Sequence, residues 1–180
     1  MLNGQELGEY IDQHFTSTLF RLETLDLYDV DSECEDFRRY LAGEPEPTAT
    51  WPDVIRDEVF RGLHTYRVHV VRSPPTDYLR YECEWGYVRN AEAGEHIRII
   101  DTAEQSKPDV VPDHDFWLIG DEHLLLMHYD PDCKFQGATI ADPELIPQYN
   151  VARDAAWAAG VDFMEYWQQH PQYRRDRVTT

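Results

Sequence analysis

The chain has 180 residues, of which 42% are hydrophobic and 13% aromatic, and its formal net charge at pH 7 is −19. This length and apolar content suit one domain with a buried core and exclude a chain that is disordered throughout. Because 35 acidic side chains outnumber 16 basic ones, we expect no direct binding to nucleic acid and no attraction to anionic membranes.

Residues 1–63 are predicted to form an acidic, mainly helical part of that domain. The first 60 residues alone hold 15 acidic and 4 basic side chains. Asn3 and Glu6 have the spacing of a capping box, and apolar residues follow them at helical intervals. The alternating segment 20–24 predicts a short extended piece after this helix.

Two further helices are expected before residue 64. The second should begin at an Asp31 or Ser32 cap and bury Cys34, Phe37 and Leu41. The third should begin after Thr50 with Pro52 in its first turn, and should bury Ile55, Val59 and Leu63.

Residues 64–172 are predicted to form the α/β part, built on a sheet of about five strands. Alternating apolar residues predict strands at 66–70 and 96–100, and three more segments predict an antiparallel meander at 116–119, 124–128 and 135–140. Helices are expected at 76–88 and 143–169, and Asp142 followed by Pro143 is a strong start for the second. We therefore expect one α+β (mixed α/β) domain over 1–172, with 173–180 as a frayed tail.

Motifs for catalysis, cofactors and metals are missing from the sequence. The three cysteines have no CxxC spacing, no G-x-S-x-G elbow surrounds a serine, and no glycine-rich phosphate loop occurs. We therefore assign no catalytic residue, no metal and no cofactor. With no signal peptide and no apolar run of membrane-spanning length, we expect a cytoplasmic protein.

Two groups of polar residues are nevertheless candidates for a site. Asp115, Asp121 and His128 are the residues that a hydrolase of phosphodiesters would use, with or without a metal. Arg72 and Arg80 flank a predicted helix start, where an anion is readily held. A sensor of small molecules or anions would use a pocket between the 76–88 helix and the meander, lined by Arg72, Arg80, Trp117, Asp121 and His128.

Several segments resemble an actinobacterial protein family of unknown function, whose members are often encoded beside Xre-type helix-turn-helix regulators. The resemblance rests on segments 67–82, 93–98, 115–121, 127–130 and 149–157. It implies a working association with transcriptional regulation. The second half also resembles a half-domain of the phospholipase-D-like fold, but no histidine here is followed two residues later by lysine. That resemblance therefore implies the fold without the phosphodiesterase chemistry.

Three functions remain open from the sequence. The first is a non-enzymatic regulatory protein whose acidic N-terminal part docks on the basic surface of a helix-turn-helix regulator. The second is the small-molecule or anion sensor, and the third is the hydrolase. Neither the oligomeric state nor the strand order follows from the sequence.

Overall fold

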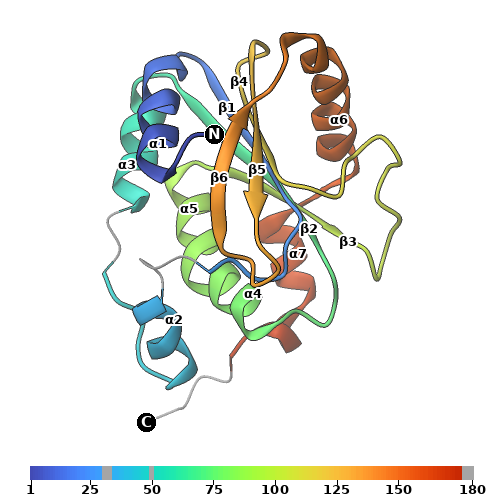
Figure 1. Ribbon diagram of the computed structural model, residues 1–180. Helices are drawn as coiled ribbons and strands as arrows, with labels where there is room; N and C mark the ends of the chain where they lie inside the picture. The colour runs from blue at the N-terminus through green and yellow to red at the C-terminus, as the bar shows by residue number, and fades with distance from the viewer. Residues whose placement is uncertain (30–33, 49–50, 176–180) are drawn as a thin grey trace.

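A seven-stranded mixed sheet forms the centre of the molecule (Figure 1). The computed structural model describes residues 1–29, 34–48 and 51–175. The strands are β1 (Thr18–Glu23), β2 (His64–Val71), β3 (His96–Asp101), β4 (Phe116–Ile119), β5 (His123–Tyr129), β6 (Phe135–Ile140) and β7 (Val161–Asp162). Their order is β6-β5-β4-β1-β2-β3-β7, in which β1, β2 and β3 are parallel and the other pairings are antiparallel.

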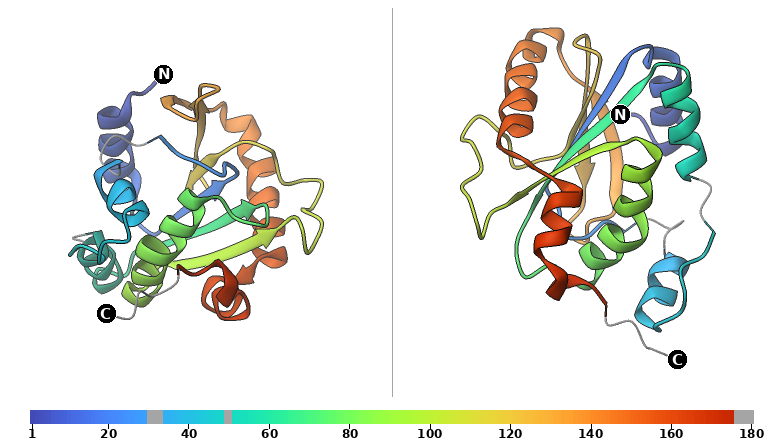
Figure 2. Two further views of the ribbon diagram at one scale, coloured as in Figure 1. Left: turned by 90° about the horizontal axis from the view of Figure 1, so that it is seen from below. Right: turned by 180° about the vertical axis from the view of Figure 1, so that it is seen from behind.

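Helices cover both faces of this sheet. The helical segments are α1 (Gly4–His14), α2 (Cys34–Leu41), α3 (Trp51–Phe60), α4 (Asp77–Tyr81), a π-helical turn (Glu82–Tyr87), α5 (Val88–Ala93), α6 (Ile146–Ala159) and α7 (Phe163–Gln169), with short 3-10 turns at Pro143–Leu145 and Pro171–Tyr173. Seen from below, α1, α2 and α3 lie across the sheet from α6 (Figure 2).

Side chains alternate along each strand, so that each strand serves two different cores. One face packs against α6 through Phe20, Val68, Ile100, Phe116 and Ala156. On the other face, Ile97 and Ile99 pack against α5 and α7, and Leu19 and Leu125 pack against α1. The charged residues of β1 and β2 lie on this second face, beneath the helix that runs from α4 to α5.

The α+β class expected from the sequence is confirmed, but the sheet has seven strands rather than about five. One additional strand is β1, which was expected only as an extended piece and pairs with both β2 and β4. The other is β7, which exists because the expected 143–169 helix is broken. At Gly160 the backbone is extended, and a Cβ there would lie 2.7 Å from the Cβ of Arg98.

The helix expected at 76–88 is longer than predicted and contains a π-helical turn. It begins at the Thr76 cap, whose side chain accepts a hydrogen bond from the Leu79 N–H. It ends at Gly94, which has a φ of 116°, a conformation that favours glycine. In α2 the buried residue is Tyr40, whereas Leu41 is exposed, which corrects the predicted inward face.

Predictions for the caps and buried residues of the N-terminal helices have mixed outcomes. The capping box of Asn3 and Glu6 is confirmed at the start of α1. Val59 was expected to be buried by α3 but is 48% exposed. The predicted caps at Asp31, Ser32 and Thr50 lie outside the described residues.

The last described residues, 173–175, contact the domain, and the rest of the tail expected from residue 173 onward lies outside the described residues. Tyr173 closes a 3-10 turn and stacks on His170. The guanidinium of Arg175 donates hydrogen bonds to the carbonyls of Tyr40 and Glu44, next to α2. Within the described residues, no helix has both the length and the apolar character needed to cross a lipid bilayer.

Candidate functional site

Four charged or ionisable side chains lie side by side on the face of β1 and β2 that is covered by the α4–α5 helix. The parallel register pairs Arg21 with Arg67 and Glu23 with His69. Residues two apart on a strand point to the same face, so the four form one compact group. Glu23 and His69 are both completely buried.

Ion pairs connect this group and fix its geometry. Glu23 Oε1 lies 2.8 Å from Arg21 Nη2, and Glu23 Oε2 lies 3.0 Å from Arg67 Nη1. Arg67 also donates from Nε to Oε1 of Glu95, at 2.6 Å. Burial alone would raise the pKa of Glu23, but the guanidinium groups of Arg21 and Arg67 outweigh this effect and lower it to about 2. Glu23 is therefore ionised at physiological pH.

His69 joins the network through two hydrogen bonds. Its Nε2 is 2.9 Å from the carbonyl oxygen of Leu25, and its Nδ1 is 2.8 Å from the hydroxyl of Tyr87. That hydroxyl donates to Oε2 of Glu23 at 2.8 Å. The Oε2 of Glu82 lies 3.6 Å from Nδ1 of His69. The network thus extends from the sheet to the π-helical turn.

Asp115 lies at the edge of the same network and is held by hydrogen bonds. Its carboxylate accepts the N–H and the hydroxyl of Thr24, each at 2.8 Å, and the hydroxyl of Tyr28 at 2.7 Å. Burial raises the pKa of Asp115, although Arg21 opposes that shift. With three donors already bound, this carboxylate is committed to holding the loop after β1.

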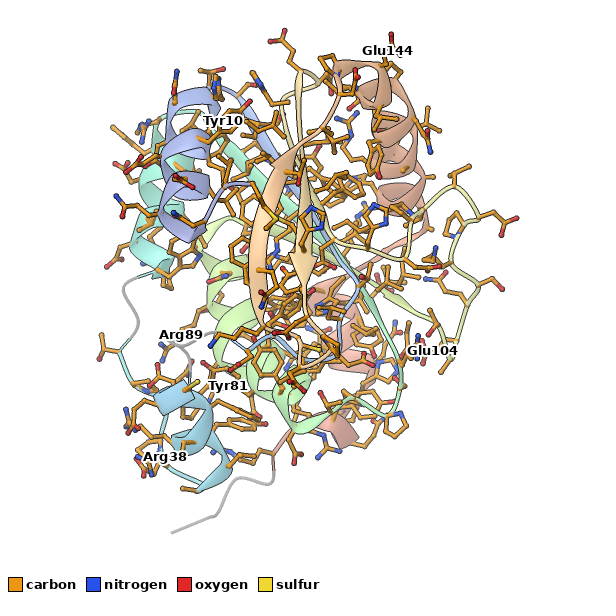
Figure 3. The ribbon with its side chains drawn as sticks, viewed as in Figure 1. Tyr10, Arg38, Tyr81, Arg89, Glu104 and Glu144 are labelled. Carbon is orange, nitrogen blue, oxygen red and sulfur yellow. The ribbon has the colours of Figure 1, made fainter. Side chains whose placement is uncertain are left out.

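A cavity of about 780 Å³ lies between these residues and the helices. Arg21, Arg67 and Trp117 form part of its floor, and the guanidinium of Arg21 lies 5.2 Å from the centre of the Trp117 ring. Its walls come from α1, α3 and the α4–α5 helix. Tyr81 and Arg89, two wall residues from that long helix, are labelled in Figure 3.

Among the charged side chains that line the cavity most are acidic, and many of its large side chains are aromatic. The lining acids are Asp12, Asp36, Glu46, Glu58, Glu82 and Glu95, and the lining bases are Arg21, Arg67 and Arg89. Each of these arginines contacts a carboxylate. Arg21 contacts Glu23 and Arg67 contacts Glu95, as described above, and Arg89 Nε lies 2.6 Å from Oε1 of Glu46. The aromatic lining residues are Phe15, Tyr28, Trp51, Tyr78, Tyr81, Trp85, Tyr87 and Trp117.

Of the five residues predicted to line a sensor pocket, Trp117 lies in this cavity and the other four do not line it. Arg72 is exposed just after β2. Arg80 is partly buried, and its Nε has no hydrogen-bond partner within the described residues. Asp121 pairs with Arg153 of α6 at 2.5 Å, on the far side of the sheet. His128 is exposed and bonds to Thr139.

The three residues predicted for a hydrolase also lie apart. Asp115 precedes β4 and Asp121 follows it, so the two are at opposite ends of a strand. His128 shares its face of β5 with Leu124 and Leu126, since residues two apart on a strand point the same way. Hydrolase activity stays a prediction that this arrangement does not favour.

Sequence reasoning missed Glu23, His69, Glu82 and Glu95 as candidate site residues. Arg67 and His69 alternate with apolar residues, a pattern typical of the outward face of a half-buried strand, but here the α4–α5 helix covers that face. The available signal was the repeated pattern of a charged residue at alternate positions, Arg21 with Glu23 and Arg67 with His69, in two segments that become neighbouring strands.

Comparison with known proteins identifies a family whose function is not established. No curated protein matches the chain. A family model matches residues 5–168, most of the chain, which agrees with the resemblance to a family of unknown function. The predicted gene neighbourhood stays a prediction. The chain belongs to the family described as Domain of unknown function (DUF6879).

Proposed function

We propose that this protein binds a small organic molecule in the cavity between the sheet and the helices α1, α3 and α4–α5. The observation that carries the proposal is a cavity of about 780 Å³ built over a buried ion-pair network. Sites for small molecules are commonly clefts of roughly 300–1,000 Å³ with a few fixed polar groups and many apolar ones. This cavity has both features.

The rigidity of the floor supports a binding role. Glu23 is completely buried and Glu95 is 2% exposed, and Arg67 contacts both of them. Buried ion pairs add little stability compared with apolar packing, and strongly perturbed groups beside a cleft are frequent at functional sites. The network therefore fits a preorganised binding surface better than a device for stability.

The charge of the cavity favours a positively charged ligand. Six lining acids face three arginines, so acidic groups outnumber basic ones even though Glu95 and Glu46 pair with Arg67 and Arg89. Aromatic rings such as those of Trp85 and Tyr81 attract cations through their electron-rich faces. We therefore propose an organic amine with an apolar or aromatic body, rather than the anion that was considered from the sequence.

Thermal denaturation with matched ligands tests this proposal. Tryptamine and indole-3-acetate have the same ring and opposite charge, so a cavity of this kind should raise the melting temperature only with the amine. A panel of aliphatic and aromatic amines, each with its carboxylate counterpart, extends the test. If no amine in the panel shifts the melting temperature, or if the carboxylates shift it equally, the proposal is wrong.

A matched pair of variants locates the binding site. Glu58 lines the cavity and accepts a hydrogen bond from Thr65, so Glu58→Gln removes one charge with little change of shape. We expect it to weaken amine binding on the order of tenfold, about 1.4 kcal/mol. Glu144→Gln is the control, since Glu144 is exposed at the start of the α6 region, far from the cavity (Figure 3). Equal effects of the two variants would remove the cavity from the proposal.

A regulatory partnership is the second candidate function, and a surface feature of α3 favours it. The side chains of Trp51, Val54 and Phe60 are 56%, 43% and 90% exposed, and Asp53 and Asp57 lie among them. Asp53 and Asp57 are paired with Arg56 and Arg61, so the negative charge that attracts a basic partner is that of the whole chain, −19. An exposed apolar surface on a chain of this charge suits a partner that is apolar and basic, as the surface of a helix-turn-helix regulator would be.

Binding to such a regulator is tested by pull-down at low and high salt, because attraction between exposed charges weakens as salt rises. Phe60→Asp should reduce binding, whereas Val110→Asp, at a 53% exposed apolar residue outside α3, should not. Absence of binding at both salt concentrations would end this candidate, and unchanged binding by Phe60→Asp would remove α3 from it.

A further inference from the structure

Three potential metal ligands meet beneath the cavity. One ligand atom each from Glu23, His69 and Glu82 lies within 4.8 Å of the other two. They come from β1, β2 and the π-helical turn, so the fold, rather than a local sequence motif, brings them together. Glu23 and His69 are fully buried, and the side chain of Glu82 is 14% exposed.

The orientation of His69 directs a lone pair at this point. A carbonyl oxygen can only accept, so the 2.9 Å contact with Leu25 requires the hydrogen on Nε2. In the neutral ring Nδ1 then carries the lone pair, toward Tyr87 and Glu82. An imidazole whose second nitrogen donates to a backbone carbonyl is the usual arrangement of a histidine that binds a metal.

Hydrogen atoms are too few to satisfy the acceptors around this point. The hydroxyl of Tyr87 has a single hydrogen, yet it lies 2.8 Å from Nδ1 of His69 and 2.8 Å from Oε2 of Glu23. The second oxygen of Glu23, Oε1, is buried and contacts Arg21 at 2.8 Å but accepts no well-directed hydrogen bond within the described residues. A cation at this point would supply the missing positive partner.

We propose that Glu23, His69 and Glu82 form a binding site for a divalent transition-metal ion. One imidazole and two carboxylates are a ligand set for Zn²⁺, Mn²⁺, Fe²⁺ or Co²⁺, rather than for Ca²⁺ or Cu⁺. Ligand atoms around such an ion lie about 3–3.5 Å apart, so the three groups close in by roughly 1 Å when the ion binds. Arg21 and Arg67 stay on Glu23, because a carboxylate has lone pairs for both.

The metal site adjoins the cavity, but metal binding does not depend on an organic ligand. Glu82 and Tyr87 also line the cavity, so the ion lies at its floor. Metal binding needs no amine, and amine binding needs no metal. The failure of one proposal therefore leaves the other to be judged by its own experiment.

Metal binding by the full chain provides the test. The protein is stripped with EDTA, dialysed, and titrated with Zn²⁺, Mn²⁺ and Co²⁺ by calorimetry, and bound metal is measured by elemental analysis. We expect one equivalent of at least one of these ions, and visible absorption bands from Co²⁺ when it is bound by nitrogen and oxygen. Absence of stoichiometric binding by all three ions overturns the proposal.

Two pairs of variants assign the ligands. His69→Gln is compared with His128→Gln, and Glu82→Gln with Glu144→Gln, because His128 and Glu144 are exposed and outside the network. Losing an outer-shell partner lowers metal affinity 10–100-fold in typical sites, so losing a ligand should lower it at least tenfold. The partly exposed Glu82 serves as the decisive position if His69→Gln does not fold. Equal affinities of Glu82→Gln and the unaltered protein contradict the assignment.

Discussion

Replacing Arg67 by methionine is the most informative perturbation of the buried network. Among the described residues, the guanidinium of Arg67 forms the ionic contact of Glu95 and one of the two ionic contacts of Glu23. Arg67→Met keeps the side-chain length and removes the charge, which leaves the carboxylate of Glu95 buried without a cation. Removing one partner of a buried ion pair typically destabilises a protein by about 3–5 kcal/mol.

The expected effect is large compared with the whole stability of a domain, which is about 5–15 kcal/mol. For a chain of this size it corresponds to a fall in melting temperature of roughly 6–20 °C. Urea denaturation followed by tryptophan fluorescence measures the free energy of unfolding directly. The control is Arg56→Met, because Arg56 and Asp53 form an exposed pair whose loss should change stability by at most about 1 kcal/mol.

The double variant Arg67→Met/Glu95→Gln tests the physical reason. Because it removes the charge that Arg67→Met leaves unpaired, it should recover part of the lost stability. The pH dependence gives a second check. The pKa of Glu23 is lowered to about 2 from an ordinary value of 4.5, so its stabilising effect is complete above the ordinary value and is lost as pH falls through 2. A destabilisation by Arg67→Met below about 1 kcal/mol would show that buried Glu95 and Glu23 do not depend on the guanidinium of Arg67.

Three further predictions concern other parts of the molecule. Gly160→Ala should destabilise the protein by about 1–3 kcal/mol, because the new Cβ would lie 2.7 Å from the Cβ of Arg98. Gly86→Ala is the control, since a Cβ there would lie 4.0 Å from its nearest neighbour, and chemical denaturation compares the stabilities of the two variants. Burial raises the pKa of Glu58, so amine affinity measured by calorimetry should begin to fall at a higher pH than for an ordinary glutamate, and an unchanged affinity down to pH 4.5 would exclude its role. Burial also raises the pKa of the Cys83 thiol, and this thiol should resist thiol reagents in the native protein, which peptide mapping after alkylation detects.

Most helices and outer strands were predictable because their signals are local. The Asn3 capping box and the Asp142 cap both form as expected, the latter accepting from the Glu144 N–H. Alternation placed β2 and β3 correctly to within a few residues. The break at Gly160 was not predictable from local signals, and the contact that requires glycine there is with Arg98 of β3, about 60 residues away in sequence.

Most residues of the candidate site could not be predicted from the sequence, for the same reason. Arg67 is 44 residues from Glu23 and 28 from Glu95, and without those partners a charged residue on a strand is expected to face solvent. Trp117 could be singled out because it lies beside a polar turn. Asp121 and His128 were equally polar, but Asp121 pairs with Arg153 of α6 and His128 is exposed on β5, outside the network.

The cavity over the buried network is the binding site that we propose for an organic cation. Calorimetric titration of the intact protein with tryptamine and with indole-3-acetate, under identical salt and pH, tests it most directly. We expect saturable binding of the amine at one site per chain and no measurable heat from the acid. Equal affinities, or tighter binding of the acid, would contradict it.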